Sequence, residues 1–228
     1  MNHFLVSAFA AFLFTSLAGI YFASKKETTE RFFGFFWLNV AFWALFVAIQ
    51  FQLQRRMSGF LWGLFLHLGC VFVPVLFLHF TLHFTQTRDK HASLLKAAYL
   101  AAVSFILLNI FTPFFTGEII NRDDYTYPKP AFLYPLYILY FQVIGFWTLV
   151  LLLKLRKVAD SKARKCLNLF IVVHILAYIG CMDNYLIMYD IRLFPLYPYG
   201  LYFLLPYAVL GSYAIAKFQA IRRSSIST

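Results

Sequence analysis

Few side chains that could do chemistry lie inside the apolar segments that make up most of this sequence. Asp183, in the stretch CMDNYLIMYDIRLFPLYPYG, is the one acidic residue well inside such a segment, and Asn184 follows it directly. A charge in hydrocarbon is costly, so it usually faces a bundle interior or a water-filled cavity. For Asp183, a ligand or proton site is one interpretation, and a structural hydrogen bond or a partly wet position at the interface is the other.

Other polar and tyrosine side chains are predicted at a similar height of the apolar segments. Taken singly, each tyrosine is typical of the aromatic belt at a membrane surface. Taken together, these residues favour a pocket with aromatic walls and few polar contacts in the outer half of the protein. The expected ligand-binding residues are Asp183, Asn184, Asn109, His67, Gln50, Tyr137 and Tyr202.

The histidines do not predict a metal site. His79 and His83 are four apart and share one helix face, but two histidines alone do not define a zinc site, and position 80 is Phe where an HExxH motif would need Glu. We interpret them as polar groups at a helix end. His174 is separated by nine residues from Asp183, which puts the two on opposite sides of a straight helix, so a hydrogen bond between helices is favoured for His174. We expect no metal and no cofactor.

The composition requires segments that are embedded in lipid. The chain has 228 residues, of which 62% are hydrophobic and 13% charged, whereas soluble domains average roughly 45–50% apolar and about 25% charged residues. This is the composition of an integral membrane protein. The net charge of +11 is explained by the Lys and Arg that cytoplasmic loops collect, so nucleic acid is not an expected partner. The three cysteines, in apolar segments without CxxC spacing, are interpreted as small hydrophobic side chains.

A membrane-spanning helix needs about 20 mostly apolar residues. Seven segments qualify, near His3–Ala23, Phe32–Gln52, Phe60–Phe84, Leu94–Phe115, Phe132–Leu153, Cys166–Tyr189 and Leu196–Phe218. The predicted fold is therefore all-α, an integral membrane bundle of seven transmembrane helices. Residues 1–218 form its single domain and residues 219–228 a short basic cytoplasmic tail. Pro74, Pro113 and Pro206 are predicted to lie within spans and to kink them.

The distribution of basic residues predicts the orientation of the spans. Of the 20 Lys and Arg residues, all but Arg55, Arg56, Arg122, Lys129 and Arg192 fall in connections and a tail on one side. The positive-inside rule makes that side cytoplasmic, with the N-terminus outside. The longest outer connection, TGEIINRDDYTYPKPAFLYP, has three prolines, which favour extended backbone. We interpret it as a solvated loop with a turn at NRDD, and a cap over an external opening is the alternative.

The last third of the chain carries motifs as well as spans. They are RKVADSKARKCLNLF before the sixth span, DNYLIMYDIRLFPLYPYG after it, and LLPYAVLGSYAIAKFQAIR in the seventh, and FLHFTLHFT ends the third. This pattern resembles the N-terminal seven-transmembrane sensor region of bacterial histidine kinases. Two features depart from it, because Asp190 stands where the motif has Gly and no kinase follows the seventh span. Retinal proteins are disfavoured, since Lys217 lies at the cytoplasmic end of its span.

The resemblance implies a receptor-like sensor in the bacterial inner membrane. Such a module would bind a small or lipophilic ligand in its outer half and signal to a cytoplasmic protein. A small-molecule or ion transporter or channel is the alternative. An intramembrane enzyme is least favoured, because HExxH, GxSxG and paired carboxylates within one span are absent from the sequence. The expected partners are membrane lipid, a small-molecule ligand and a cytoplasmic signalling protein, and a homodimer is left open.

Overall fold

The computed structural model describes residues 3–24, 28–53, 59–121, 126–193 and 200–226. Over these residues the chain is mostly helical, at 85%, and seven of the helices they form are long and apolar enough to cross a membrane. The all-α class of seven transmembrane helices is therefore confirmed, while the predicted orientation of the termini stays a prediction. The chain forms two compact units, Met1–Phe146 with Met188–Asp190, and Trp147–Ile187 with Ile191–Thr228.

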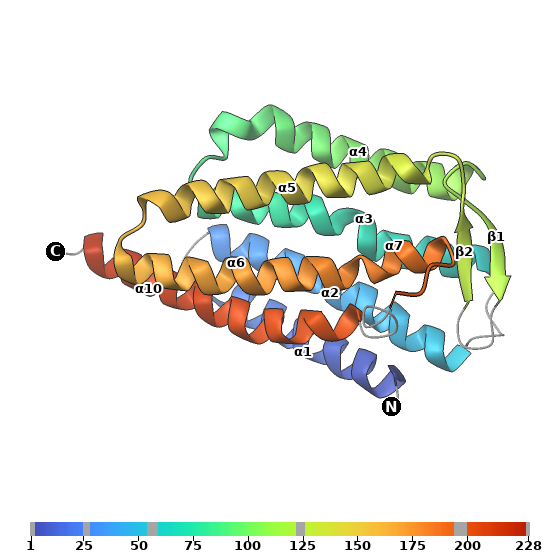
Figure 1. Ribbon diagram of the computed structural model, residues 1–228, viewed down its shortest axis with the longest axis horizontal. Helices are drawn as coiled ribbons and strands as arrows, with labels where there is room; N and C mark the ends of the chain where they lie inside the picture. The colour runs from blue at the N-terminus through green and yellow to red at the C-terminus, as the bar shows by residue number, and fades with distance from the viewer. Residues whose placement is uncertain (1–2, 25–27, 54–58, 122–125, 194–199, 227–228) are drawn as a thin grey trace. The chain divides into compact units, whose positions relative to one another are not determined.

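Helix pairs that approach closely form the first unit. Its helices are α1 (His3–Ala23), α2 (Thr28–Leu53), α3 (Gly59–Phe84), α4 (Ala92–Phe111) after the short 3₁₀ turn η1 (Asp89–His91), and the first half of α5 (Tyr134–Val158). α1 and α2 pack along one another (Figure 1). α2 meets α3 at Gly69, where an added Cβ would lie 2.7 Å from the Cβ of Trp43. There the Asn39 amide donates to the Gly69 carbonyl at 2.6 Å.

The connection between α4 and α5 folds as an antiparallel hairpin of β1 (Thr116–Asn121) and β2 (Thr126–Pro130), with Thr116 opposite Pro130. The predicted extended backbone is confirmed, although strand pairing was not anticipated. The predicted turn at NRDD falls mostly on residues 122–125, which lie outside the described residues.

The predicted end of the fourth span was wrong. α4 stops at Phe111, and Thr112 is extended with φ −140° and ψ 152°. The physical reason is Pro113, because a proline disfavours helical backbone in the residue before it. Pro113 therefore follows the helix and does not kink it. Pro74 does lie inside α3.

The second unit contains the end of α5, the long helix α6 (Ser161–Cys181) and most of α7 (Asp183–Met188). It continues through η2 (Gly200–Phe203), α9 (Leu204–Pro206), the π-helical turn η3 (Tyr207–Gly211) and α10 (Ser212–Ile226). α10 packs against α6 and runs past the predicted span end at Phe218. The predicted Tyr-Pro turn before Gly200 and the start of the predicted seventh span at Leu196 lie outside the described residues.

A carboxylate begins α6. Asp160 is its N-cap, and its Oδ1 accepts hydrogen bonds from the backbone N–H groups of Lys162 and Ala163 at 2.8 and 2.9 Å. Such a cap satisfies donors that the first turn of a helix cannot pair internally.

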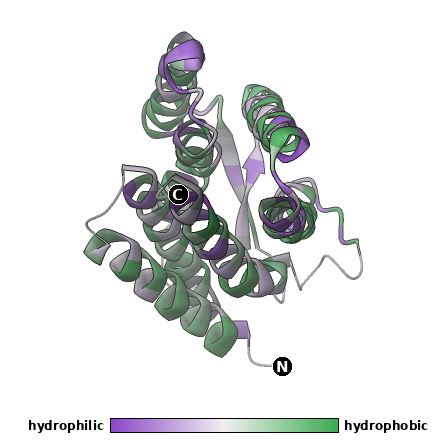
Figure 2. Cartoon of the chain, turned by 90° about the vertical axis from the view of Figure 1, so that its left-hand side faces the viewer, coloured by the Kyte–Doolittle hydropathy of each residue, from purple (hydrophilic) through white to green (hydrophobic). Residues whose placement is uncertain are grey.

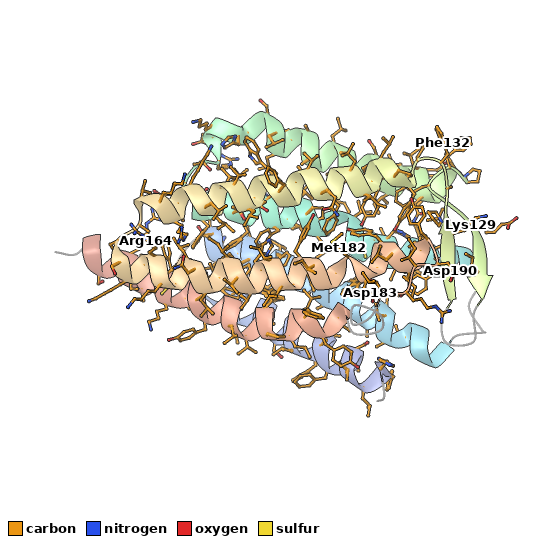
Figure 3. The ribbon with its side chains drawn as sticks, viewed as in Figure 1. Lys129, Phe132, Arg164, Met182, Asp183 and Asp190 are labelled. Atoms are coloured by element: carbon orange, nitrogen blue, oxygen red, sulfur yellow. The ribbon has the colours of Figure 1, made fainter. Side chains whose placement is uncertain are left out.

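A residue in the left-handed backbone conformation ends α7. The Ile191 N–H donates to the Leu186 carbonyl at 2.9 Å. Asp190, which is labelled in Figure 3, lies between them and has a φ of 60°. This is the Schellman arrangement, in which glycine is the preferred residue at the left-handed position. The family resemblance expects glycine at position 190, and the backbone conformation there is one that glycine adopts readily.

Apolar side chains cover the outside of the helices. Phe12, Phe146 and Tyr213 are exposed by 71%, 67% and 54%, and most helical turns in Figure 2 have hydrophobic colouring. Exposed apolar surface of this extent needs a non-aqueous neighbour, and lipid supplies it in a protein whose helices can span the bilayer.

Candidate functional site

Five aromatic side chains gather in the first unit where α3, α4 and α5 meet the hairpin. We call them the aromatic cluster: His67, Phe105, Phe115, Tyr134 and Tyr137. The His67 ring centroid lies 5.2 Å from that of Phe115, 5.6 Å from Tyr134 and 6.2 Å from Tyr137. Phe105 contacts Phe115 and Tyr137 at 5.8 and 5.6 Å. All these contacts are within the range at which aromatic rings attract one another edge to face or offset.

His67 is buried in this cluster with both ring nitrogens engaged. It is 2% exposed, with Nδ1 2.6 Å from the Gly63 carbonyl oxygen and Nε2 3.3 Å from the Tyr134 hydroxyl. A carbonyl can only accept, so we assign the ring proton to Nδ1. Nε2 is then the acceptor, and the Tyr134 O–H donates to it. The histidine is thus held as a neutral group between a helix backbone and a phenol.

Asn109 lies near the end of α4. Among the described residues, its side-chain oxygen has a hydrogen-bond partner and its side-chain nitrogen has none. It is 2% exposed, and its Oδ1 accepts a hydrogen bond from the Thr116 hydroxyl at 2.8 Å. Its Nδ2 has no hydrogen-bond partner within residues 3–24, 28–53, 59–121, 126–193 and 200–226. Buried polar groups are nearly always paired, so such a donor calls for an explanation.

The hairpin lies against the first turns of α3. A Cβ added at Gly63 would lie 3.2 Å from the Pro128 Cγ of β2 and 3.9 Å from the Thr116 Oγ1 of β1. Thr116 therefore contacts the start of α3 and the Asn109 side chain at once. Through Phe115 and Thr116, the segment that leads into β1 touches both polar residues of the site.

Asp183 lies in the second unit, at the junction between α6 and α7, next to Met182 (Figure 3). Its carboxylate accepts a hydrogen bond from the backbone N–H of Gly200. Within the described part of the chain, Asp183 Oδ1 has no hydrogen-bond partner. The side chain therefore joins the start of α7 to the start of the last span.

Two glycines allow this junction to close. A Cβ added at Gly180 would lie 2.5 Å from the Phe203 Cβ and 2.9 Å from the Gly200 carbonyl oxygen. One added at Gly200 would lie 2.5 Å from the Gly180 carbonyl oxygen. Such separations are shorter than van der Waals contact, so only residues without a Cβ fit at these two positions.

The predicted ligand residues divide between the two units. His67 and Tyr137 come together in the first unit, and Asn109 lies in the same unit, where it binds Thr116 next to Phe115. Asn184 and Tyr202 are half-buried in the second unit with Asp183, and the Asn184 amide donates to the Cys181 carbonyl at 3.1 Å. Gln50 lies in α2, and its side chain is outside the described residues.

Sequence reasoning missed Phe115 and Thr116. The fourth span was predicted to include Phe115 as a helical residue, so neither position was considered for the site. Pro113 was the available signal, because a proline after Thr112 ends the helix and allows the chain to turn back beside Asn109.

Three other histidines, His79, His83 and His174, have aromatic partners. The Phe32 ring stacks on His79 at 3.6 Å and on His83 at 4.7 Å, and His79 Nδ1 lies 2.9 Å from the Tyr99 hydroxyl. Within the described part of the chain, no group of three His, Cys, Asp or Glu side chains could hold a metal ion. His174 is buried beside Tyr207, with ring centroids 5.5 Å apart, and its predicted hydrogen bond between helices stays a prediction.

Comparison with protein families identifies the chain. Residues 6–222 match the family described as the N-terminal 7TM region of histidine kinase. No curated protein and no solved structure matches the chain. Because the match covers nearly all of its 228 residues, the chain belongs to this family, and the resemblance is confirmed. It is a multi-pass membrane protein of a sensory type.

Proposed function

We propose that this protein senses a small lipophilic ligand in the outer half of its membrane-spanning helices, in the bacterial inner membrane, and signals to a cytoplasmic partner. Family membership supports the sensory role. The observation that carries the ligand site is the aromatic cluster, where buried His67 and Tyr134 place polar groups among rings, with buried Asn109 joined to the adjoining Thr116. Ligand sites are typically of this kind, mostly apolar with a few placed polar groups.

α5 offers a direct path from the cluster to the opposite membrane surface. Its first turns carry Tyr134 and Tyr137, and its last turn carries Arg156 and Lys157. Because a helix transmits displacement along its axis, a ligand that moves the first turn also moves the last. The connection that follows presents exposed Lys157 and Lys162 and supplies a basic surface for an acidic partner or anionic lipid.

The cluster is unlike a transport path. Transport of ions or polar solutes relies on ionisable residues along a route through the membrane, whereas the polar groups here are neutral. Among the described residues, Glu30 is the buried side chain of a fully charged type, and its carboxylate accepts a hydrogen bond from Ser24 beside the α1–α2 connection. Sensing therefore has better support than transport.

Hydrogen–deuterium exchange on the full chain in proteoliposomes tests this function. The probes are solvent fractions of the host cell's membranes and of its spent medium. We expect at least one fraction to slow exchange in α5 near Tyr134 and also to change exchange at residues 157–162. A parallel flux assay with small ions and solutes should show no protein-dependent uptake. Unchanged exchange with every fraction, or protein-dependent uptake, would refute sensing.

A further inference from the structure

The unpaired amide of Asn109 constrains the chemistry of the ligand. Thr116 already occupies its oxygen, so what remains is the N–H side of the amide, buried and without a partner among the described residues. An acceptor oxygen on a ligand would satisfy this donor.

Two polar members of the cluster, His67 and Tyr134, are paired with each other and with the helix backbone, without any charged partner. The Gly63 carbonyl takes the Nδ1 proton of His67, and His67 Nε2 takes the Tyr134 proton. Neither residue has a further proton to donate, so Asn109 supplies the free donor among the three. The five cluster members are all neutral in this arrangement, and a charged ligand would be desolvated there without a counter-ion.

The shape of the site comes from its rings. Phe115 and Tyr137 are fully buried, and their centroids lie 5.5 Å apart at an interplanar angle of 63°. Aromatic faces and edges attract flat unsaturated groups. Rings arranged in this way therefore favour contact with a planar group over a saturated chain of equal size.

We propose that the aromatic cluster binds a neutral, flat, carbonyl-bearing lipophilic molecule whose oxygen accepts a hydrogen bond from Asn109 Nδ2. Entry requires the hairpin to move from Gly63, because Pro128 and Thr116 lie on that turn of α3. Thr116 holds the oxygen side of the amide and so turns its N–H side toward the ligand, which makes it a positioning residue. This inference rests on the proposed sensing function and specifies its ligand.

Matched probes test the carbonyl without any mutation. The full chain in nanodiscs is heated with methyl naphthyl ketone, with ethylnaphthalene, which lacks the acceptor, or with naphthoate, which is charged. The fraction that stays folded is measured by size-exclusion chromatography over a range of probe concentrations. We expect the ketone to stabilise the protein at concentrations roughly tenfold lower than ethylnaphthalene does, the ratio that one net hydrogen bond supplies. Naphthoate should have no effect. Equal stabilisation by ketone and hydrocarbon would overturn the proposal.

Variants assign the effect to Asn109. In Asn109→Leu the advantage of the ketone over the hydrocarbon should disappear, and in Thr116→Val it should shrink by roughly two- to threefold. Asn39→Leu is the matched control, because its amide donates to Gly69 on a different helix pair, and the advantage should persist there. An advantage that survives in Asn109→Leu would reject the assignment.

Two sources supply this chemistry, a membrane-dissolved quinone and a ketone that arrives through water. Nanodiscs prepared with a prenylated naphthoquinone distinguish them from nanodiscs given the soluble ketone. Stabilisation by either one supports the proposal and assigns the source. If neither stabilises while cell fractions still change deuterium exchange, the ligand class is wrong and sensing stands.

Discussion

Replacing Gly180 by alanine tests whether the α6–α7 junction is as closely packed as the structure has it. The added methyl would lie 2.5 Å from the Phe203 Cβ and 2.9 Å from the Gly200 carbonyl oxygen. Neither atom belongs to the flexible end of a side chain. Relief therefore requires the backbone of η2 to move away from α6, together with the Gly200 N–H that binds Asp183.

The magnitude follows from two opposing terms. Overpacking a filled site costs typically about 1–3 kcal/mol, and backbone contacts lie toward the upper end. Replacing Gly by Ala inside a helix returns up to about 1 kcal/mol, and less at Gly180 because it is the residue before the last of α6. The net loss of folding free energy should be about 2 kcal/mol. For a chain of this size that corresponds to a fall of roughly 4–8 °C in apparent melting temperature.

Gly19 supplies the control within the same protein. It lies inside α1, and a Cβ added there meets nothing within 4 Å, so Gly19→Ala should raise the melting temperature slightly through helix propensity. Both variants are heated in the same detergent, and the folded fraction is followed by size-exclusion chromatography. If Gly180→Ala were as stable as Gly19→Ala, the close approach of Gly180 to η2 would be wrong.

Two further substitutions test local backbone geometry. Asp190→Gly should raise the free energy of unfolding by about 0.5–1 kcal/mol, because φ is 60° there and glycine adopts it without steric cost; a lower melting temperature would contradict the left-handed end of α7. Asp160→Ala should lower the free energy of unfolding by about 1 kcal/mol through loss of the α6 cap. Asp160→Asn should keep most of the stability, because Asn also caps helices. Equal losses in the two variants would mean that the cap contributes little.

The candidate site was only partly predictable. His67, Asn109 and Tyr137 could be selected because polar and tyrosine residues inside apolar segments are few, and they lie in one unit. Asp183 was selected by the same reasoning, yet the structure gives its carboxylate a bond to the Gly200 backbone. A residue type indicates that a side chain needs a partner in lipid, but it does not indicate which partner the fold supplies.

The sequence by itself determined the seven helices. Lipid cannot hydrogen-bond backbone groups, so a span must pair them internally, and runs of about 20 apolar residues indicate helices in local composition. His3–Ala23 has the same bounds in the prediction and in the structure. Pro113 also marks the end of α4 in the sequence, although the fourth span was predicted to continue past it to Phe115.

Tertiary structure decided how these helices and the hairpin fit together. Spans in lipid are apolar on most faces, so no periodicity marks the face that packs inward. The pairing of β1 with β2, the contact of Thr116 with Asn109, and the approach of Gly180 to Gly200 all join residues from different elements. Such contacts depend on helix rotation and on the ends of elements, and these were settled only when the side chains packed.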